Sequence, residues 1–439
     1  MDTRGNQPRT VAEHQEAVQL LLQNLLLTTR RPAERPAAPA YTDAASPTEV
    51  LDLVRAAGRV LAEDVRAPGS LPPFDNSQMD GYAVRTADLA NPGGTRAELP
   101  VTTPIPAGIS APPLPPGSAA PIMTGAMLPA GADAVVPIER AVPARFPSER
   151  ELPGATVALP AGVSPGEYVR PAGSDIRAGA VALSDGTPLG ASQLGLLAAL
   201  GIPQVLVHAP FQVLLLSTGD EVVEPGRPLE PGQIHDANTT LLAVSLQEAG
   251  AEVVLARIVA DSPDEFLARL RDDLGRHRVD LILTSGGISK GAYEVVRLAL
   301  ASDGVQFLSV AMQPGGPQGI GSLDGIPFLG FPGNPVSSLV SFEMFLRPAL
   351  GAVTGRPAPR AQLPAVLTEE AHSPAGKYQV RRGRYSPPAV PGAVGRVELI
   401  GGPGSHLVHA LASSNALVHI PAEMDTVPAG AEVTVWLLD

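Results

Sequence analysis

The sequence predicts a multidomain α/β protein, in which a parallel α/β domain lies between a helical and β-rich N-terminal region and a C-terminal β domain. A chain of 439 residues exceeds one ordinary hydrophobic core, so two to four domains are expected. Strand-like and helix-like segments alternate from Phe211 to Leu350, which favours a mostly parallel sheet covered on both faces. From Pro357 onward, short runs of alternating apolar and polar residues predict strands.

Composition excludes several classes of function. The net charge of -13, without a basic stripe, excludes general nucleic-acid binding. The absence of cysteine excludes disulfides, thiolate metal sites, iron–sulfur clusters and a cysteine nucleophile. Glu13 and Glu16 precede the N-terminal leucines, unlike a secretory signal, and no transmembrane segment is expected. Cytoplasmic residence is the resulting expectation.

The N-terminal region begins with a helical pattern over residues 11–28, which indicates core packing or, alternatively, an oligomer contact. A second amphipathic helix is expected over Thr48–Leu61, and another helix over Leu183–Leu200. Between them, prolines, glycines and short apolar runs predict a small β-rich domain. We therefore expect four parts: residues 1–66 together with 180–210, residues 67–179, residues 211–356 and residues 357–439.

The α/β region has clear element boundaries. A capping box at Ser262–Glu265, with proline in the first turn, begins a helix that runs to about Arg276. The other expected strands are 212–216, 252–260, 279–284, 305–310 and 327–331, and the other expected helices are 238–248, one beginning near Gly291, and 335–350.

Two glycine turns follow apolar strands and precede helices in this region. Ser285-Gly286-Gly287 ends one strand, and Phe331-Pro332-Gly333-Asn334-Pro335 ends another. Glycines let backbone N–H groups approach an anion closely, and a helix N-terminus favours negative charge. Neither turn has the spacing of a dinucleotide fingerprint or a Walker motif. The pair predicts a substrate that carries more than one anionic group.

Carboxylates gather at the predicted strand ends. Asp220, Glu221 and Asp261 follow strands directly, and Asp236 and Glu294 are near others. Ligands of open α/β sheets bind outside the carboxyl ends of the strands. Oxygen ligands favour a hard cation such as Mg²⁺, although a structural network of helix caps and ion pairs is an equal alternative.

Three further groups of residues bear on the candidate site. Asp75 and Asp80 lie among turn-forming residues, where a carboxylate on its own most often caps its own backbone. The cluster Arg381–Arg384 is either a solvated loop or a phosphate clamp. The histidines show no metal-ligand spacing.

These segments together resemble the molybdopterin molybdenumtransferase family, MoeA, which also forms the C-terminal part of gephyrin. The matching motifs are PPFDNSQMDGYAV, PIMTGA, GSDI, STGDE, SGGIS and GFPGNPVSS, in the family's order from about Leu61 to Ser338. Arg381–Gly383 and Gly404–His406 fit as well. The resemblance implies an elongated helical N-terminal domain, a β-rich insertion, a parallel molybdopterin-binding-like domain and a C-terminal β domain.

The resemblance also implies an activity. The family's reaction takes adenylylated molybdopterin and molybdate, releases AMP and yields molybdenum cofactor with Mg²⁺ present. It implies a homodimer whose active site lies between the α/β domain of one subunit and the N-terminal part of the other. Two alternatives stay open: a molybdopterin adenylyltransferase, and a non-catalytic molybdopterin-binding scaffold.

Site residues are carried over by motif. The expected catalytic residues are Asp80, Thr124, Asp175, Glu221, Asp261 and Glu294, with Glu221 and Asp261 in the cation region and Asp80 contributed by the facing subunit. The expected substrate-binding residues are Ser285, Gly286, Gly287, Ser289, Pro332, Gly333, Asn334, Pro335, Arg382 and Ser405.

The sequence departs from the family pattern in four places. Glu294 stands where Asp is common, and Ser309, Gln313 and Gly316 stand where many relatives carry lysines. Fewer cations predict weaker binding of an anionic substrate, unless Arg297 or Lys290 compensates.

Overall fold

The computed structural model describes residues 7–29, 47–90, 94–219, 221–259, 262–288 and 295–438, and the side chains of 25–29 and 259 are outside this description. The chain divides into two compact units. Unit 1 comprises Met1–Glu49, Gly58–Val60 and Val207–Asp439, and unit 2 comprises Val50–Ala57 and Leu61–Leu206. Six residues named above lie outside the described ranges: Asp220, Asp261, Ser289, Lys290, Gly291 and Glu294.

A six-stranded sheet of order β15-β12-β16-β20-β19-β17 forms the centre of unit 1. Its first four strands are parallel, and β19 runs antiparallel to both β20 and β17. Continuous apolar runs such as FQVLLLST in β12 are typical of parallel strands buried on both faces. The bounds are β12 Phe211–Thr218, β15 Ala251–Val259, β16 Leu281–Ser285, β17 Val305–Ser309, β19 Pro317–Leu323 and β20 Ile326–Phe331.

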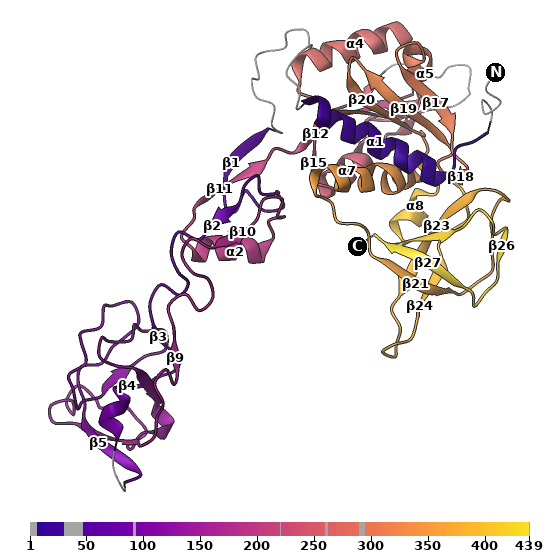
Figure 1. Ribbon diagram of the computed structural model, residues 1–439. Coiled ribbons are helices and arrows are strands. Elements are labelled where there is room, and N and C mark those ends of the chain that lie inside the picture. Colours follow the sequence, from indigo (N-terminus) through magenta and orange to yellow (C-terminus); the bar gives the residue numbers. More distant parts are fainter. Residues whose placement is uncertain are drawn as a thin grey trace. The chain divides into compact units, whose positions relative to one another are not determined.

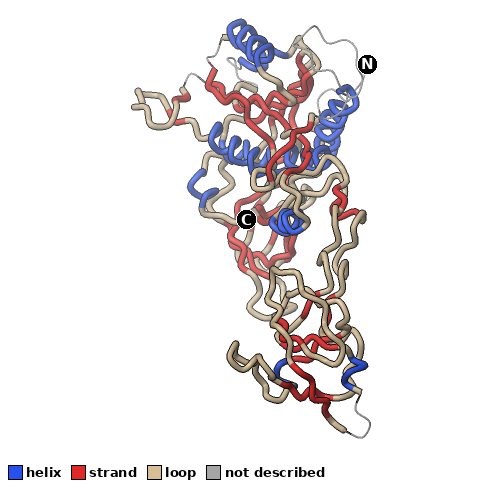
Figure 2. Tube along the Cα trace, turned by 90° about the vertical axis from the view of Figure 1, so that its left-hand side faces the viewer, coloured by secondary structure: helices blue, strands red, loops and turns tan. Residues whose placement is uncertain are grey.

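Helices cover both faces of this sheet (Figure 1). On one face α4 (Pro263–Arg276) and α5 (Val295–Leu300) pack against Leu214, Ile282 and Phe328. On the other, α1 (Val11–Thr29), α3 (Asn238–Glu248) and α6 (Pro335–Ser341) pack against Leu215, Leu283 and Leu329. A π-helical turn, η3 (Phe342–Leu346), joins α6 to α7 (Arg347–Thr354). Figure 2 shows these helices (blue) around the strands (red).

The C-terminal part of unit 1 is a β barrel. Its strand order is β18-β23-β24-β21-β27-β25, and pairing of β23 with β25 closes the sheet. Alternate residues such as Val397, Val418 and Val435 fill the interior, whereas Val380 and Leu417 join the core of the α/β sheet. The bounds are β18 Met312–Gln313, β21 Gln362–Leu367, β22 Ala371–His372, β23 Tyr378–Ser386, β24 Gly395–Leu399, α8 Val408–Ala412, β25 Ala416–Ile420, β26 Thr426–Val427 and β27 Glu432–Leu437.

Unit 2 consists mainly of short strands in small antiparallel sheets. A three-stranded sheet of order β6-β4-β7 buries Tyr82, Val84 and Val136, and β5 pairs with β8 beside it. The strands, of which β1 and β11 extend into unit 1, are β1 Thr48–Asp52, β2 Val65–Arg66, β3 Asn76–Ser77, β4 Gly81–Val84, β5 Arg96–Pro100, β6 Ala120–Ile122, β7 Ala134–Pro137, β8 Thr156–Pro160, β9 Val169–Arg170, β10 Val181–Leu183 and β11 Gln204–His208. The helices are η1 Thr86–Leu89, η2 Ile138–Arg140 and α2 Ala191–Ala199.

The expected helix over Thr48–Leu61 is wrong. This segment is strand β1 followed by turns, and β1 pairs with β11. The helix expected over Leu183–Leu200 is confined to α2, because Val181–Leu183 pairs with β2. Helix α1 packs against α7 and lies in unit 1, and the expected grouping of residues 1–66 with 180–210 stays a prediction. The remaining expected domain boundaries stay predictions.

The helical run Pro335–Thr354 is, by length and composition, apolar enough to cross a membrane. Its most apolar window is 67% buried inside the protein. Its buried side chains join the core beneath the α/β sheet, so this run is a core helix of the fold.

Candidate functional site

Three adjacent parallel strands of unit 1 end at the same edge of the sheet. Ser217 of β12 is in register with Ser285 of β16, which is in register with Phe331 of β20. The segments that follow these strands therefore begin side by side. This edge holds both predicted glycine turns, as expected for a ligand site of an open α/β sheet.

The first glycine turn cannot hold any larger residue. Gly286 and Gly287 have φ angles of +93° and +65°. A Cβ on Gly286 would lie 2.7 Å from the carbonyl oxygen of Thr218, and one on Gly287 would lie 2.8 Å from the Thr218 hydroxyl oxygen. The Gly286 N–H donates to the Phe331 carbonyl at 3.0 Å, which ties the first turn to the second. Backbone conformation and close packing both require glycine here.

The second glycine turn, Phe331–Pro335, lies directly against the first. A Cβ on Gly333 would be 3.4 Å from Gly286 Cα. The Asn238 side-chain amide donates to the Gly333 carbonyl at 2.6 Å and so connects α3 to this turn. Asn334 is the N-cap of α6 and Pro335 begins the helix, although the Asn334 side chain makes no capping hydrogen bond.

Ser285 supports the two turns from within the protein. Its side chain is buried, and its hydroxyl oxygen lies 3.1 Å from that of Ser338. The Ser338 hydroxyl donates to the Pro332 carbonyl at 2.6 Å. The hydroxyl contacts of Ser285 therefore hold the strand end against α6, and its expected role in substrate binding stays a prediction.

A loop of the barrel that contains Gly402 and Ser405 contacts Arg382 at one point and the first turn of α6 at another. The Ser405 carbonyl accepts a hydrogen bond from the Val336 N–H at 3.2 Å, in the first turn of the helix. Arg382 of β23 is 1% exposed and donates from Nη2 to the Gly402 carbonyl. Within the described residues its Nε and Nη1 have no hydrogen-bond partner. Burial, and secondly the charge of Arg381, lowers the pKa of Arg382.

Ser309, Gln313 and Gly316, where the resemblance to the family leads us to expect lysines, lie at the end of β17, at the end of β18 and just before β19. Gln313 accepts a hydrogen bond from Gln379 at 2.8 Å, and the Ser309 carbonyl accepts one from the Arg9 N–H. Gly315 lies against Ser337 and Ser341 of α6, and a Cβ on Gly316 would meet only ordinary contacts at 3.4 Å. Arg297 donates its backbone N–H to the Gly287 carbonyl, so α5 begins at the first turn. Lys290 is outside the described residues.

Glu221 is the described carboxylate of the predicted cation region. It is exposed, and its carboxylate lies over Gly219 at the end of β12. Asp236 is instead used as a helix cap, because it accepts hydrogen bonds from the N–H groups of Asn238 and Thr239. No group of three potential metal ligands occurs among the described residues, and Asp261 and Glu294 lie outside them.

Unit 2 brings together Asp80 and Thr124, which are 44 positions apart in the sequence. Gly81 of β4 is in register with Ile122 of β6, so the residues at these strand ends meet. Both the N–H and the hydroxyl of Thr124 donate to Asp80 Oδ1, at 2.7 and 2.8 Å. These bonds, the backbone one first, lower the pKa of Asp80.

Asp75 and Asp175 differ from this pair. The Asp75 carboxylate accepts the Ala172 N–H at 2.7 Å, so it binds the backbone of a segment 97 positions away and not its own turn. Asp175 is exposed, and its backbone N–H donates to the Leu71 carbonyl at 3.0 Å. Among the described residues no hydrogen bond joins Asp175 to Asp80 or Thr124.

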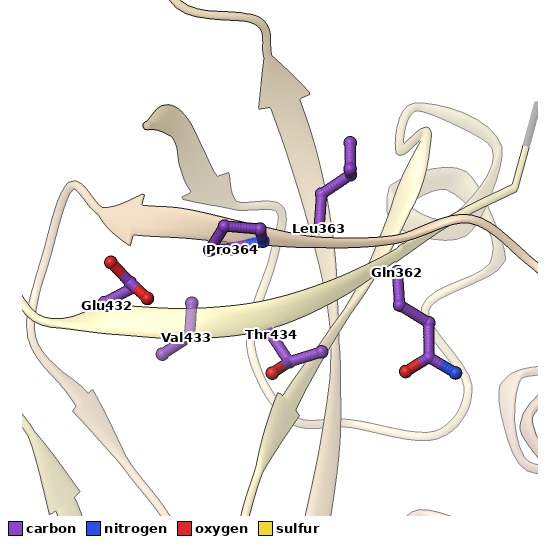
Figure 3. A pocket seen from close by; sticks show the side chains of 6 residues that line it. All are labelled: Gln362, Leu363, Pro364, Glu432, Val433 and Thr434. Carbon is purple, nitrogen blue, oxygen red and sulfur yellow. The ribbon is translucent and has the colours of Figure 1, made fainter. Parts of the chain in front are cut away.

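A surface pocket on the barrel does not fit an anionic substrate. It lies between β21 and β27, and Figure 3 shows its lining residues. The only charged side chain among them is Glu432, which repels anions. The pocket is lined by Gln362, Leu363, Pro364, Glu432, Val433 and Thr434.

Sequence reasoning missed two residues of this site. Thr218 and Asn238 are 6% and 7% exposed, and within the described part of the chain Thr218 Oγ1 and Asn238 Oδ1 have no hydrogen-bond partner. Both flank the joined glycine turns. Thr218 is the last residue of β12 and is followed by Gly219. Its position at the end of a predicted strand was the signal that the sequence offered. Nothing in the sequence near Asn238 indicates its contact with Gly333.

Three family regions match this chain, one after another along the sequence. The chain matches the MoeA N-terminal region (domain I and II) over residues 10–201 and a probable molybdopterin binding domain over residues 214–352. It matches the MoeA C-terminal region (domain IV) over residues 364–438.

Individual relatives and solved structures agree with these matches. Molybdopterin molybdenumtransferase 2 of Mycobacterium tuberculosis is 44% identical over 88% of this chain and 93% of its own. Molybdopterin molybdenumtransferase of Haemophilus influenzae is 35% identical over the same shares. The crystal structure of a molybdopterin biosynthesis MoeA protein from Pyrococcus horikoshii has a TM-score of 0.75 at 29% identity, covering 99% of this chain and 100% of that one. The chain therefore belongs to the MoeA family of molybdopterin molybdenumtransferases.

Proposed function

We propose that this protein transfers molybdenum from molybdate to adenylylated molybdopterin, with release of AMP and formation of molybdenum cofactor. The observation that carries the proposal is the pair of joined glycine turns with the buried Arg382 guanidinium on the barrel strand β23. The relatives' names and the match of all three family regions support the same activity. The regions at 10–201 and 364–438 favour the transferase over an adenylyltransferase that consists essentially of the α/β domain.

The described residues fit anionic substrates by charge and by hydrogen bonding. The glycine turns leave the backbone open to close approach by phosphate oxygens, because no side chain is tolerated at Gly286 or Gly287. Arg382 presents buried N–H donors that lack protein partners in the described structure, and an arginine can grip an oxyanion with two bonds. The substrate's dithiolene sulfurs supply the soft ligands for molybdenum, so a protein without cysteine suits this chemistry.

The proposed reaction uses Mg²⁺, although the described residues do not form a complete site for this ion. Glu221 is a single exposed carboxylate, and the described residues by themselves do not form a complete cation site. We infer that Glu221 acts together with Asp261, and we derive no reaction step through the ion. When bound, Mg²⁺ would neutralise charge on the substrate phosphates. Removal of Mg²⁺ should abolish AMP release, and full activity in a chelator would refute this part.

We also propose a cytoplasmic homodimer in which Asp80 and Thr124 act with the α/β domain of the partner subunit. The Thr124 hydrogen bonds keep Asp80 ionised and fixed in orientation, as a residue that completes a shared site requires. Complementation tests the sharing. Chains carrying Asp80→Asn and chains carrying Arg382→Met should each be inactive alone, and their mixed dimers should regain activity. Failure of properly mixed dimers to regain activity would exclude a shared site.

The activity itself is tested by AMP release from adenylylated molybdopterin with Mg²⁺, with and without molybdate. Molybdate-dependent release is the expected result. Binding of the substrate without AMP release would refute catalysis and favour the scaffold alternative.

A further inference from the structure

Asn238 has a side chain that the fold holds in place without using all of its hydrogen-bonding capacity. The start of α3 is already capped by Asp236, whose carboxylate accepts the N–H groups of Asn238 and Thr239 at 2.9 and 3.0 Å. The Asn238 side chain is therefore not needed as a helix cap. It nevertheless stays 7% exposed and points to the second glycine turn, where it contacts Gly333.

The orientation of the Asn238 amide is fixed by chemistry. The Gly333 carbonyl can only accept a hydrogen bond, so the group 2.6 Å from it must be the side-chain NH₂. Oδ1 is then held beside the junction of the two glycine turns, where Gly333 lies against Gly286. In the described structure this oxygen is buried and has no donor.

A buried acceptor at this place recognises a different part of the ligand from the groups around it. Backbone N–H groups and Arg382 attract anionic oxygens, whereas the Asn238 oxygen is electronegative and neutral and binds only a donor. Leaving such an acceptor unpaired is unfavourable, so a ligand that supplies an N–H gains affinity and one that lacks it is rejected. The pterin ring carries N–H donors and no formal charge.

We infer that Asn238 Oδ1 accepts a hydrogen bond from an N–H group of the substrate's pterin ring and selects for that heterocycle. This inference rests on the proposed function. It assigns Asn238 to recognition of the pterin, separate from the groups that bind phosphate or molybdate. Asn238 also positions the second glycine turn through its NH₂ group, so a simple loss of activity in a variant would not separate the two roles.

The two roles are separated by combining a change in the protein with a change in the ligand and comparing the losses in affinity. Binding of pterin is compared with binding of its analogue without the exocyclic amino group and its N3-methyl analogue, by quenching of pterin fluorescence in the full-length protein and in Asn238→Ala. In the natural chain, one analogue should bind about tenfold more weakly than pterin. In Asn238→Ala, pterin should lose a similar factor and that analogue should lose almost nothing further, because the same hydrogen bond is already missing.

Equal losses for all three ligands in Asn238→Ala would overturn the inference and leave Asn238 with a positioning role only. Thr240→Ala, an exposed position on the same helix, is the matched control and should bind all three ligands as the natural chain does. If Asn238→Ala does not fold, the natural chain still decides, because equal binding of pterin and both analogues refutes the hydrogen bond. Failure of the natural chain to bind pterin would overturn the inference alone, because the proposed function is tested separately by AMP release from adenylylated molybdopterin.

Discussion

Replacement of Arg382 by methionine should weaken anion binding without weakening the fold. Arg382 is 1% exposed, and its described protein hydrogen bond is the one from Nη2 to the Gly402 carbonyl. Burial lowers its pKa, which means that the fold bears a desolvation cost for this charge. Methionine has a comparable volume and no charge, so the free energy of unfolding should stay constant or increase.

The loss in binding follows from the two unpaired nitrogens, Nε and Nη1. A hydrogen bond to a charged group contributes about 1.5–3 kcal/mol, so losing one such bond lowers affinity roughly tenfold and losing two lowers it about a hundredfold or more. The pattern to measure is therefore weak molybdate and substrate binding in a chain of unchanged stability. Calorimetric titration gives the affinities, and denaturant unfolding gives the free energy.

Arg384→Met is the matched control for this substitution. Arg384 lies two positions along β23, is exposed, and donates to the Ser413 carbonyl. Its replacement should leave both quantities nearly unchanged. The reasoning would be refuted if Arg382→Met lowered stability by several kcal/mol while the affinity for molybdate and substrate stayed the same. Arg382 would then be a structural residue that supports the loop at Gly402.

Three further predictions concern the first glycine turn, position 316 and the dependence of stability on pH. Gly286→Ala should destabilise unit 1 in a denaturant-unfolding assay and abolish substrate binding, because the φ of Gly286 is +93° and a backbone oxygen lies 2.7 Å from the added Cβ. The control Gly275→Ala in α4, where the added Cβ meets nothing within 4 Å, should be neutral or slightly stabilising in the same assay. Gly316→Lys should tighten molybdate binding, since the site has room for a side chain, and Gly316→Gln, of similar size but uncharged, should not. Burial lowers the pKa of His419 from 6.5 to about 4. Between these two pH values the unfolded chain binds a proton that the folded chain does not, so the free energy of unfolding should fall as pH falls from 6.5 towards 4. This fall is about 2 kcal/mol at pH 5, and His419→Gln should remove that part of the pH dependence.

The order of elements in the α/β domain could be predicted because its signals are local. Continuous apolar runs distinguished buried parallel strands, and glycine or proline marked their ends, so the range 238–248 for α3 agrees with the structure. Thr48–Leu61 was mistaken for a helix because its apolar residues also fit helical spacing. The competing interaction is pairing of β1 with β11, about 150 residues later, which local periodicity cannot reveal.

The candidate site shows the same division between local and distant causes. The glycine turns were recognisable as breaks after strands, but the close contact with Thr218 on a neighbouring strand, which excludes a side chain at Gly286 and Gly287, was not. Register between β12 and β16 produces that contact, and register is a property of the assembled sheet. Asn238 escaped notice for a similar reason, because its partner Gly333 is 95 positions away.

Ser285 shows how a motif residue can support the geometry of a site from within the protein. It belongs to the segment that resembles the family, yet its hydroxyl is buried beside Ser338 and the Pro332 carbonyl. A hydroxyl in that position fixes the distance between the end of β16 and the start of α6, and both glycine turns depend on that distance. A motif can therefore be required by the site's geometry even where the side chain faces the protein interior. We propose that the groups that meet the substrate are those with unused hydrogen-bonding capacity at the joined turns and at Arg382.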